Sequence, residues 1–147
     1  MSIRFRFGDP QANCIALGVM SPNIRFDEIV ATSPEDPVHG IANAALAAAA
    51  GREGTCVLHA GAEAYALSFV PSADGLRLDI VVWPDRSREP GRSVLVFQAR
   101  GTAASVLLPV WRGLRDLAAR WPADGWAAPF PAETVAQLGG ALAATRI

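Results

Sequence analysis

Histidine and cysteine are the residue types here whose chemistry a catalytic or metal site would use first. The chain has two histidines, His39 and His59, and two cysteines, Cys14 and Cys56. No local motif places a nucleophile beside His39, so we interpret it as a solvated residue in the first turn of a helix. Cys56 and His59 lie on one predicted strand at a spacing that points them to opposite faces. Because no second close pair of ligands exists, we predict no metal site, cofactor or catalytic residue.

The carboxylates do not form an acid and base pair either. Asp27-Glu28 and Glu35-Asp36 are adjacent residues, and neighbours on a strand diverge, while Asp36 is predicted to cap a helix. The chain contains no lysine, which excludes Schiff-base chemistry. It also lacks a phosphate loop, a dinucleotide fingerprint and a nucleophile elbow. The sequence therefore favours binding over catalysis.

Two segments are typical of protein-binding surfaces. The loop 84–92 carries three arginines that can meet an acidic partner, although a simply solvated hairpin explains it too. The segment 121–130 contains aromatic residues of the kind that anchor interfaces, with a loop folded onto the core as the alternative. The predicted partner-binding residues are Trp83, Arg86, Arg88, Trp126 and Phe130.

Length and composition bound the class of protein. With 147 residues, 51% of them hydrophobic, we expect a single globular domain spanning 1–147. A net charge of −1 argues against a nucleic-acid partner. No apolar run approaches the roughly 20 residues of a membrane span, and the N-terminus alternates unlike a signal peptide. We therefore expect a cytoplasmic protein without membrane contact.

Period-two patterns predict the strands. They occur at 2–7, 13–20 and 24–30, the second inside a sheet and the third at an edge. Residues 55–70 change parity near Gly61, which indicates either one strand with a bulge there or two short strands. Strands at 76–83 and 93–100 follow, and the last is apolar on both faces, so it is expected to be central.

Capping residues and apolar stripes predict the helices. Asp36, Pro37 and Gly51 delimit a helix at 37–50. A second helix covers 103–121, and Pro109 lies either near its start or at a kink. A short helix from 131 to 138 is ended or interrupted by Gly139-Gly140.

Together these elements predict an α+β fold: an antiparallel sheet of about five or six strands, two main helices packed on one face, and a short C-terminal helix. The back of the sheet near Val81, Trp83, Leu95 and Phe97 then has no assigned cover. The N-terminal strands, a second copy or another protein would have to lie against it.

This order of elements, with a last helix that begins at Phe130-Pro131 after a tryptophan-containing loop, resembles the build of small bacterial immunity-type proteins. The resemblance implies a non-enzymatic binding or accessory protein of a bacterium, which acts as a homodimer or binds a protein partner. A secretion-type chaperone is a second reading, since its helix, strands, helix core resembles residues 37–121. The alternative is a small enzyme or ligand-binding domain with a pocket between sheet and helices, lined by Tyr65, Trp83 and Trp111.

Overall fold

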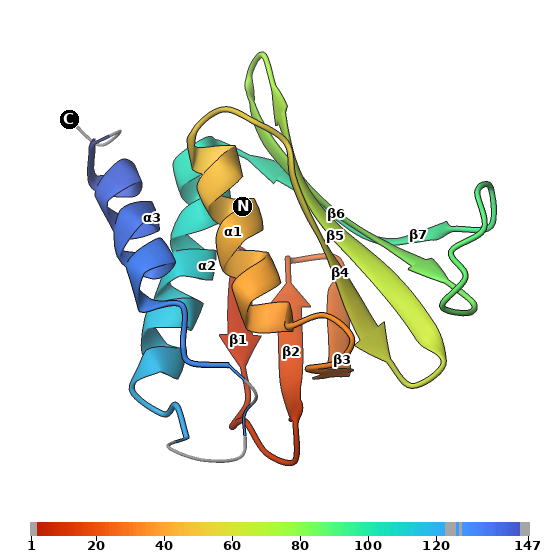
Figure 1. Ribbon diagram of the computed structural model, residues 1–147. Coiled ribbons are helices and arrows are strands. Elements are labelled where there is room, and N and C mark those ends of the chain that lie inside the picture. The colour runs from red at the N-terminus through yellow and green to blue at the C-terminus, as the bar shows by residue number, and fades with distance from the viewer. Residues whose placement is uncertain (1–2, 123–125, 127, 145–147) are drawn as a thin grey trace.

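The computed structural model describes residues 3–122, 126 and 128–144, and Figure 1 shows the arrangement. The elements in chain order are β1 (Arg4–Phe7), β2 (Cys14–Met20), β3 (Arg25–Ala31), α1 (Pro37–Ala49), β4 (Gly54–Ala60), β5 (Glu63–Ser72), β6 (Gly75–Trp83), β7 (Val94–Gly101), α2 (Ala103–Ala118) and α3 (Ala132–Ala144). The α+β class is confirmed. No helix of the described residues is long and apolar enough to cross a membrane.

The strands form two antiparallel sheets, so the prediction of one sheet with five or six strands is wrong. Sheet A has the order β1-β2-β3, and sheet B has the order β4-β5-β6-β7. Each sheet has one strongly apolar face, and the two faces stack instead of joining edge to edge. Phe26 of sheet A meets Tyr65 of sheet B, with ring centroids 5.2 Å apart. Stacking removes much of both apolar faces from water.

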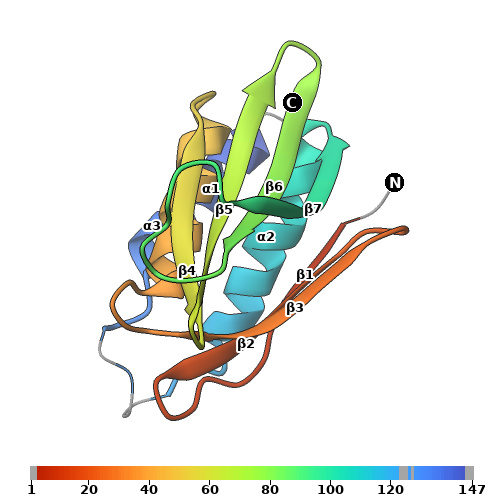
Figure 2. The ribbon, with the colours of Figure 1, turned by 90° about the vertical axis from the view of Figure 1, so that its right-hand side faces the viewer.

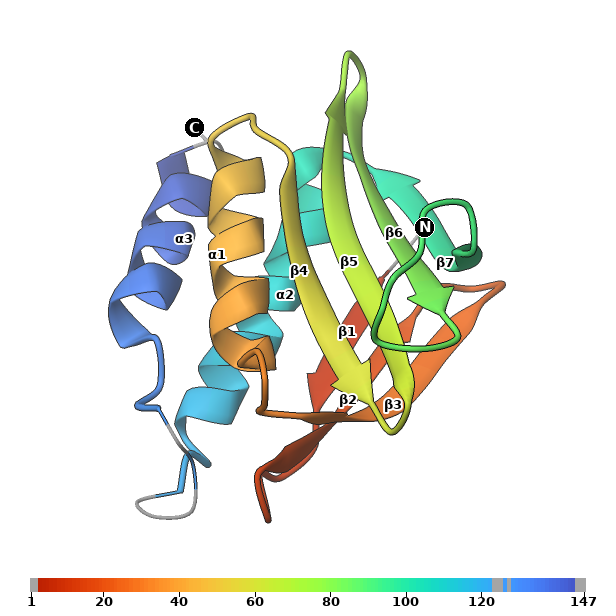
Figure 3. The ribbon, with the colours of Figure 1, turned by 45° about the vertical axis from the view of Figure 1, so that its right-hand side comes forward.

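The helices complete the core on the other side. α1 packs on β4 and β5, while α2 packs on β1, β6 and β7. α3 forms an outer layer against α1 and α2, as Figures 1 and 3 show. We call the face of sheet B toward these helices and sheet A its inner face, and the opposite face its outer face.

The predicted ends of α1 are confirmed by its hydrogen bonds. Asp36 Oδ1 accepts from the N–H groups of Val38 and His39, at 2.9 and 3.1 Å. Pro37 occupies the first helical position, and Gly51 after the helix has a φ of +82°.

α3 extends further than predicted, because Gly139-Gly140 does not end it. A Cβ on Gly139 would lie 2.7 Å from Nε1 of Trp111, so the missing side chain lets α3 pack closely on α2. This glycine therefore serves helix packing rather than helix termination.

Two strand predictions changed with the pairing. The parity change near Gly61 is a hairpin turn rather than a bulge, since Ala60 pairs with Glu63 and Gly61 has a φ of +61°. β7 is an edge strand, not a central one. A register shift beside Ile80 and Val81 places Phe97 on the inner face and Leu95 on the outer face, which explains why both faces looked apolar.

The outward edge of β1 is closed by α2. Gly8 N–H donates to Ala16 O at 2.9 Å, so by alternation the carbonyls of Phe5 and Phe7 point away from β2. Arg120 Nη2 donates to Phe7 O at 2.9 Å, and a Cβ on Gly113 would lie 2.8 Å from Phe5 O. Only a glycine lets α2 lie this close to the strand.

We expect Gly113→Ala to lower the free energy of unfolding by about 1–3 kcal/mol, because the new methyl group meets a backbone oxygen that cannot move away. Gly140→Ala is the matched control, since a Cβ there meets nothing within 4 Å. It should raise stability by up to about 1 kcal/mol through helix propensity. Urea unfolding of both variants checks this, and equal stabilisation by both would refute the close contact.

Candidate functional site

The candidate site lies on the outer face of sheet B, which faces the viewer in Figure 2. Direct cross-strand partners share a face, and the register therefore places one apolar residue of each strand in a row. This apolar row consists of Val57, Ala66, Val81 and Leu95. Leu95, at the end of the row, is 51% exposed. The helices contact the inner face, so the row lies on the side of the sheet that they leave open.

A second row at the end of the same face contains His59, Ala64 and Trp83. The loop 84–92 folds back over this end, as Figure 2 shows, and Arg86 Nη2 donates to Gly61 O at 3.3 Å. Trp83 is half-buried beside the apolar row. The sequence analysis predicted Trp83 and Arg86 as partner-binding residues, and the structure brings them to one end of one surface.

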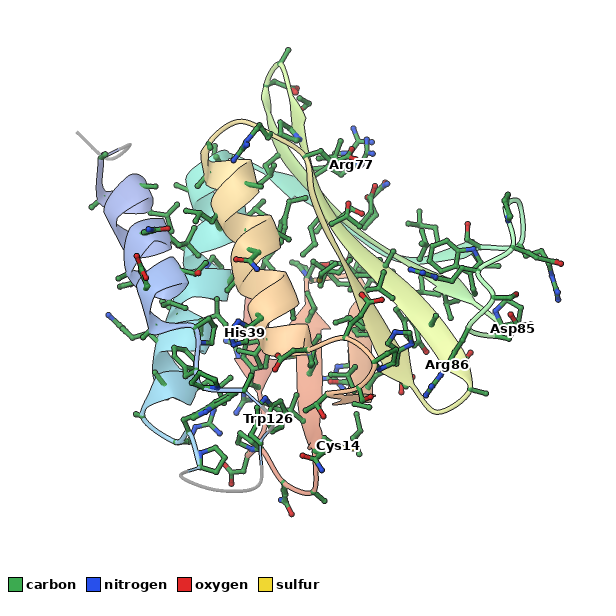
Figure 4. All side chains as sticks on the ribbon, in the orientation of Figure 1. Cys14, His39, Arg77, Asp85, Arg86 and Trp126 are labelled. Carbon is green, nitrogen blue, oxygen red and sulfur yellow. The ribbon has the colours of Figure 1, made fainter. Side chains whose placement is uncertain are left out.

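Charged and polar groups border the apolar row on its other side. Arg77 Nε lies 2.8 Å from Asp79 Oδ2, and Gln98 Nε2 donates to Asp79 Oδ1 at 3.0 Å. In Figure 4, Arg77 and Arg86 lie toward opposite ends of sheet B. The surface thus has an apolar centre with a polar rim, the usual anatomy of a protein interface.

The loop itself is partly neutralised by internal contacts. Hydrogen bonds from the hydroxyl and the N–H of Ser87 lower the pKa of the Asp85 carboxyl. Arg92 lies 3.4 Å from Glu89. Arg88 is exposed with a φ of +53°, and it makes no ion pair with any described residue. Arg88 is therefore available to an acidic partner.

Trp126 and Phe130 lie elsewhere, in an aromatic cluster with Trp121. Both rings are 5.2 Å from the Trp121 ring, centroid to centroid. Trp126 Nε1 donates to Asp36 Oδ2 at 3.1 Å, which ties the segment to the start of α1. In Figure 4, Trp126 lies below the start of α1, away from Arg86 at the end of sheet B. The contacts match the alternative of a loop folded onto the core.

The two histidines lie in different environments. His39, interpreted as solvated, donates from Nε2 to Pro129 O at 2.7 Å. His59 is only 3% exposed, and neither ring nitrogen has a hydrogen-bond partner among the described residues. Its nearest charged group is Glu35, with Nε2 and Oε1 3.8 Å apart. In the described part of the chain, no three histidine, cysteine or acidic side chains group as metal ligands.

We expect His59→Leu to raise the free energy of unfolding by about 1–2 kcal/mol, because it removes two buried polar atoms that lack partners. His39→Leu, the matched substitution, should lower it by about 1 kcal/mol through loss of the bond to Pro129. Urea titration at neutral pH measures both. Destabilisation by His59→Leu would show that the ring has a polar partner.

Cys56 is buried against α1. Burial, and then the negative charge of Glu35, raise the pKa of its thiol to about 12. Its neighbour across the interface with α1 is Gly40, whose missing side chain leaves room for the thiol. Cys14 is only partly buried.

We expect iodoacetamide at pH 8 to alkylate Cys14 and leave Cys56 unmodified, because only the thiolate reacts and Cys56 is both protonated and buried. Peptide mass spectrometry after short labelling distinguishes the two. In urea both should react, which controls for reagent quality, and fast labelling of Cys56 in the native protein would contradict its burial.

The residues proposed to line a ligand pocket do not meet in one cavity. Tyr65 lies on the inner face of sheet B and Trp83 on the outer face of the adjacent strand. Trp111 packs under the Arg115 guanidinium, 4.5 Å from the ring centroid, beside α3. The sheet itself separates the first two side chains.

Comparison of the chain with protein-family models, curated proteins and solved structures found no match.

Proposed function

We propose that this chain is a non-enzymatic protein-binding protein that forms a homodimer through the outer face of sheet B. The observation that carries the proposal is the apolar row ending at Leu95, which is 51% exposed on a face bordered by charged groups. Exposed apolar side chains on an open sheet face, here Leu95 beside the partly buried Val57 and Val81, mark interaction surfaces in soluble proteins.

A second copy suits this surface because the apolar row runs across all four strands of sheet B. A two-fold axis near the middle of the row would stack the row on its equivalent in the second copy. Trp83 would act as an aromatic anchor near the interface, and the loop 84–92 would close one end.

The exposed Arg88 and the tethered Arg86 favour an acidic protein as a further partner of the dimer. An accessory or immunity-like role in the cytoplasm of a bacterium is the setting we propose. Neither nucleic acid nor membrane is part of it, since the net charge is −1.

The test is the mass of the protein in solution. We expect the wild-type chain to sediment as a dimer, and Trp83→Arg and Leu95→Arg each to shift it to a monomer, because each places an unpaired charge in the proposed apolar interface. Ile24→Arg is the control, since Ile24 is also exposed but lies on the turn between β2 and β3. It should leave the dimer intact.

A wild-type chain that remains monomeric at about millimolar concentration would remove the homodimer. Circular dichroism of Leu95→Arg confirms that the fold survives, and this variant is the safer of the two because its side chain is already half exposed.

A further inference from the structure

The outward edge of β3 differs from that of β1 because no element closes it. Ser21 N–H donates to Ile24 O at 2.9 Å and Thr32 N–H to Asn13 O at 3.0 Å, which fixes the alternation of the β2–β3 ladder. The backbone groups of Arg25, Asp27, Ile29 and Ala31 therefore point away from β2. Within the described residues, no backbone hydrogen bond reaches them.

Of the devices that usually protect an edge strand, β3 carries charged side chains, namely Arg25, Asp27 and Glu28, but neither a proline nor a bulge. It is seven residues long and pairs with β2 without a register shift. Ile29, near its middle, is 65% exposed. The edge therefore presents regular donors and acceptors beside an apolar side chain.

In Figure 1, sheet B runs diagonally past β3 and extends beyond it, and we call this overhanging part of sheet B the roof. Tyr65 covers Phe26 on β3 itself. The register continues this inner-face row from Tyr65 to Val82 and Val94. Val82 is only partly buried and Val94 is 61% exposed, so the row continues as apolar surface beyond β3.

The roof also carries negative charge. The Tyr65 hydroxyl lies 3.1 Å from both Glu28 Oε1 and Glu63 Oε1, and no cationic side chain of the described residues pairs with either carboxylate. A lysine or arginine on an incoming strand would neutralise them.

A second copy does not fit this edge. Antiparallel pairing of β3 with itself requires a two-fold axis perpendicular to sheet A, which puts both copies of sheet B on the same side. Each roof would then occupy the space above the other copy's β3, where Tyr65 already lies. The space suits a single strand without a domain above it.

We infer that the β3 edge binds one extended segment of a partner protein as an additional strand of sheet A, with apolar residues toward Val82 and Val94 and a basic residue toward Glu28 and Glu63. Strand addition to an open edge supplies affinity through the main chain and specificity through alternate side chains. This surface is separate from the apolar row of the outer face, and the inference goes beyond the proposed dimer.

The test is a selection for binders of the full chain from a displayed library of random peptides about ten residues long. We expect the selected peptides to alternate apolar residues and to carry a lysine or arginine. A synthetic peptide of the selected sequence should protect the amide hydrogens of Arg25, Asp27, Ile29 and Ala31 from exchange. Ile29→Pro should weaken binding by about tenfold or more, because it removes an outward N–H at a position where an edge strand tolerates proline.

Ile29→Thr is the matched control, since it keeps the N–H and the β-branched side chain. Methylation of alternate peptide amides tests the same hydrogen bonds on the wild-type chain, whether or not Ile29→Pro folds. Glu28→Gln combined with Glu63→Gln should weaken binding less at high salt than at low salt, because salt screens the charge pair that the change removes.

The inference is overturned if the selection yields no binder, or if Ile29→Pro and the methylated peptides bind as tightly as their controls. It is also overturned if Ile29→Pro converts a wild-type dimer to a monomer, since a second copy would then be the occupant. Peptide binding by Leu95→Arg separates the two proposals, because this variant lacks the proposed dimer surface and retains the β3 edge.

Discussion

The contact between the inner faces of two unequal sheets is the constraint on which the structure depends. Sheet A is narrower than sheet B, so sheet A and the helices together cover only part of the inner face of sheet B. Phe26 against Tyr65 marks the last covered position, and Val82 and Val94 lie beyond it. The outer face receives no helix, since α1 and α2 both pack on the inner side. The unequal widths and one-sided helices therefore leave two apolar surfaces on sheet B.

Local patterns were sufficient to predict most of the elements but not how the strands pair. The alternation of β1 and the capping of α1 by Asp36 depend on neighbours in sequence, so both could be predicted. The division into two sheets depends on contacts between distant residues, such as Phe26 with Tyr65, which leave no periodic signal. The register shift in β7 makes both faces of the strand look apolar in the sequence, but a buried central strand gives the same pattern.

Only part of the candidate site was predicted, because its position also depends on contacts between distant residues. Residue type identified Trp83, Arg86 and Arg88, and the hairpin connection brings them to one end of the outer face. Trp126 has the same residue type but a different environment, because Asp36 caps α1 with one oxygen and accepts the Trp126 N–H with the other. The spacing of residues in the sequence shows that Asp36 can cap α1, but not that it also binds Trp126. The exposure of Leu95 likewise follows only from the register shift.

The two edges of sheet A differ, because the β1 edge is covered and the β3 edge is open. α2 and the turn that follows it close β1, with Gly113 of α2 against Phe5 O and Arg120 of the turn on Phe7 O. No described element covers β3 in this way, and its own charges are Arg25 and Asp27, which lie 3.4 Å apart, and Glu28. A long, regular edge strand without a proline or bulge is an aggregation hazard in a protein that leaves it unused. Protection of one edge beside openness of the other therefore supports a binding role for β3, and the uncovered Val82 and Val94 above it indicate where the bound strand is buried.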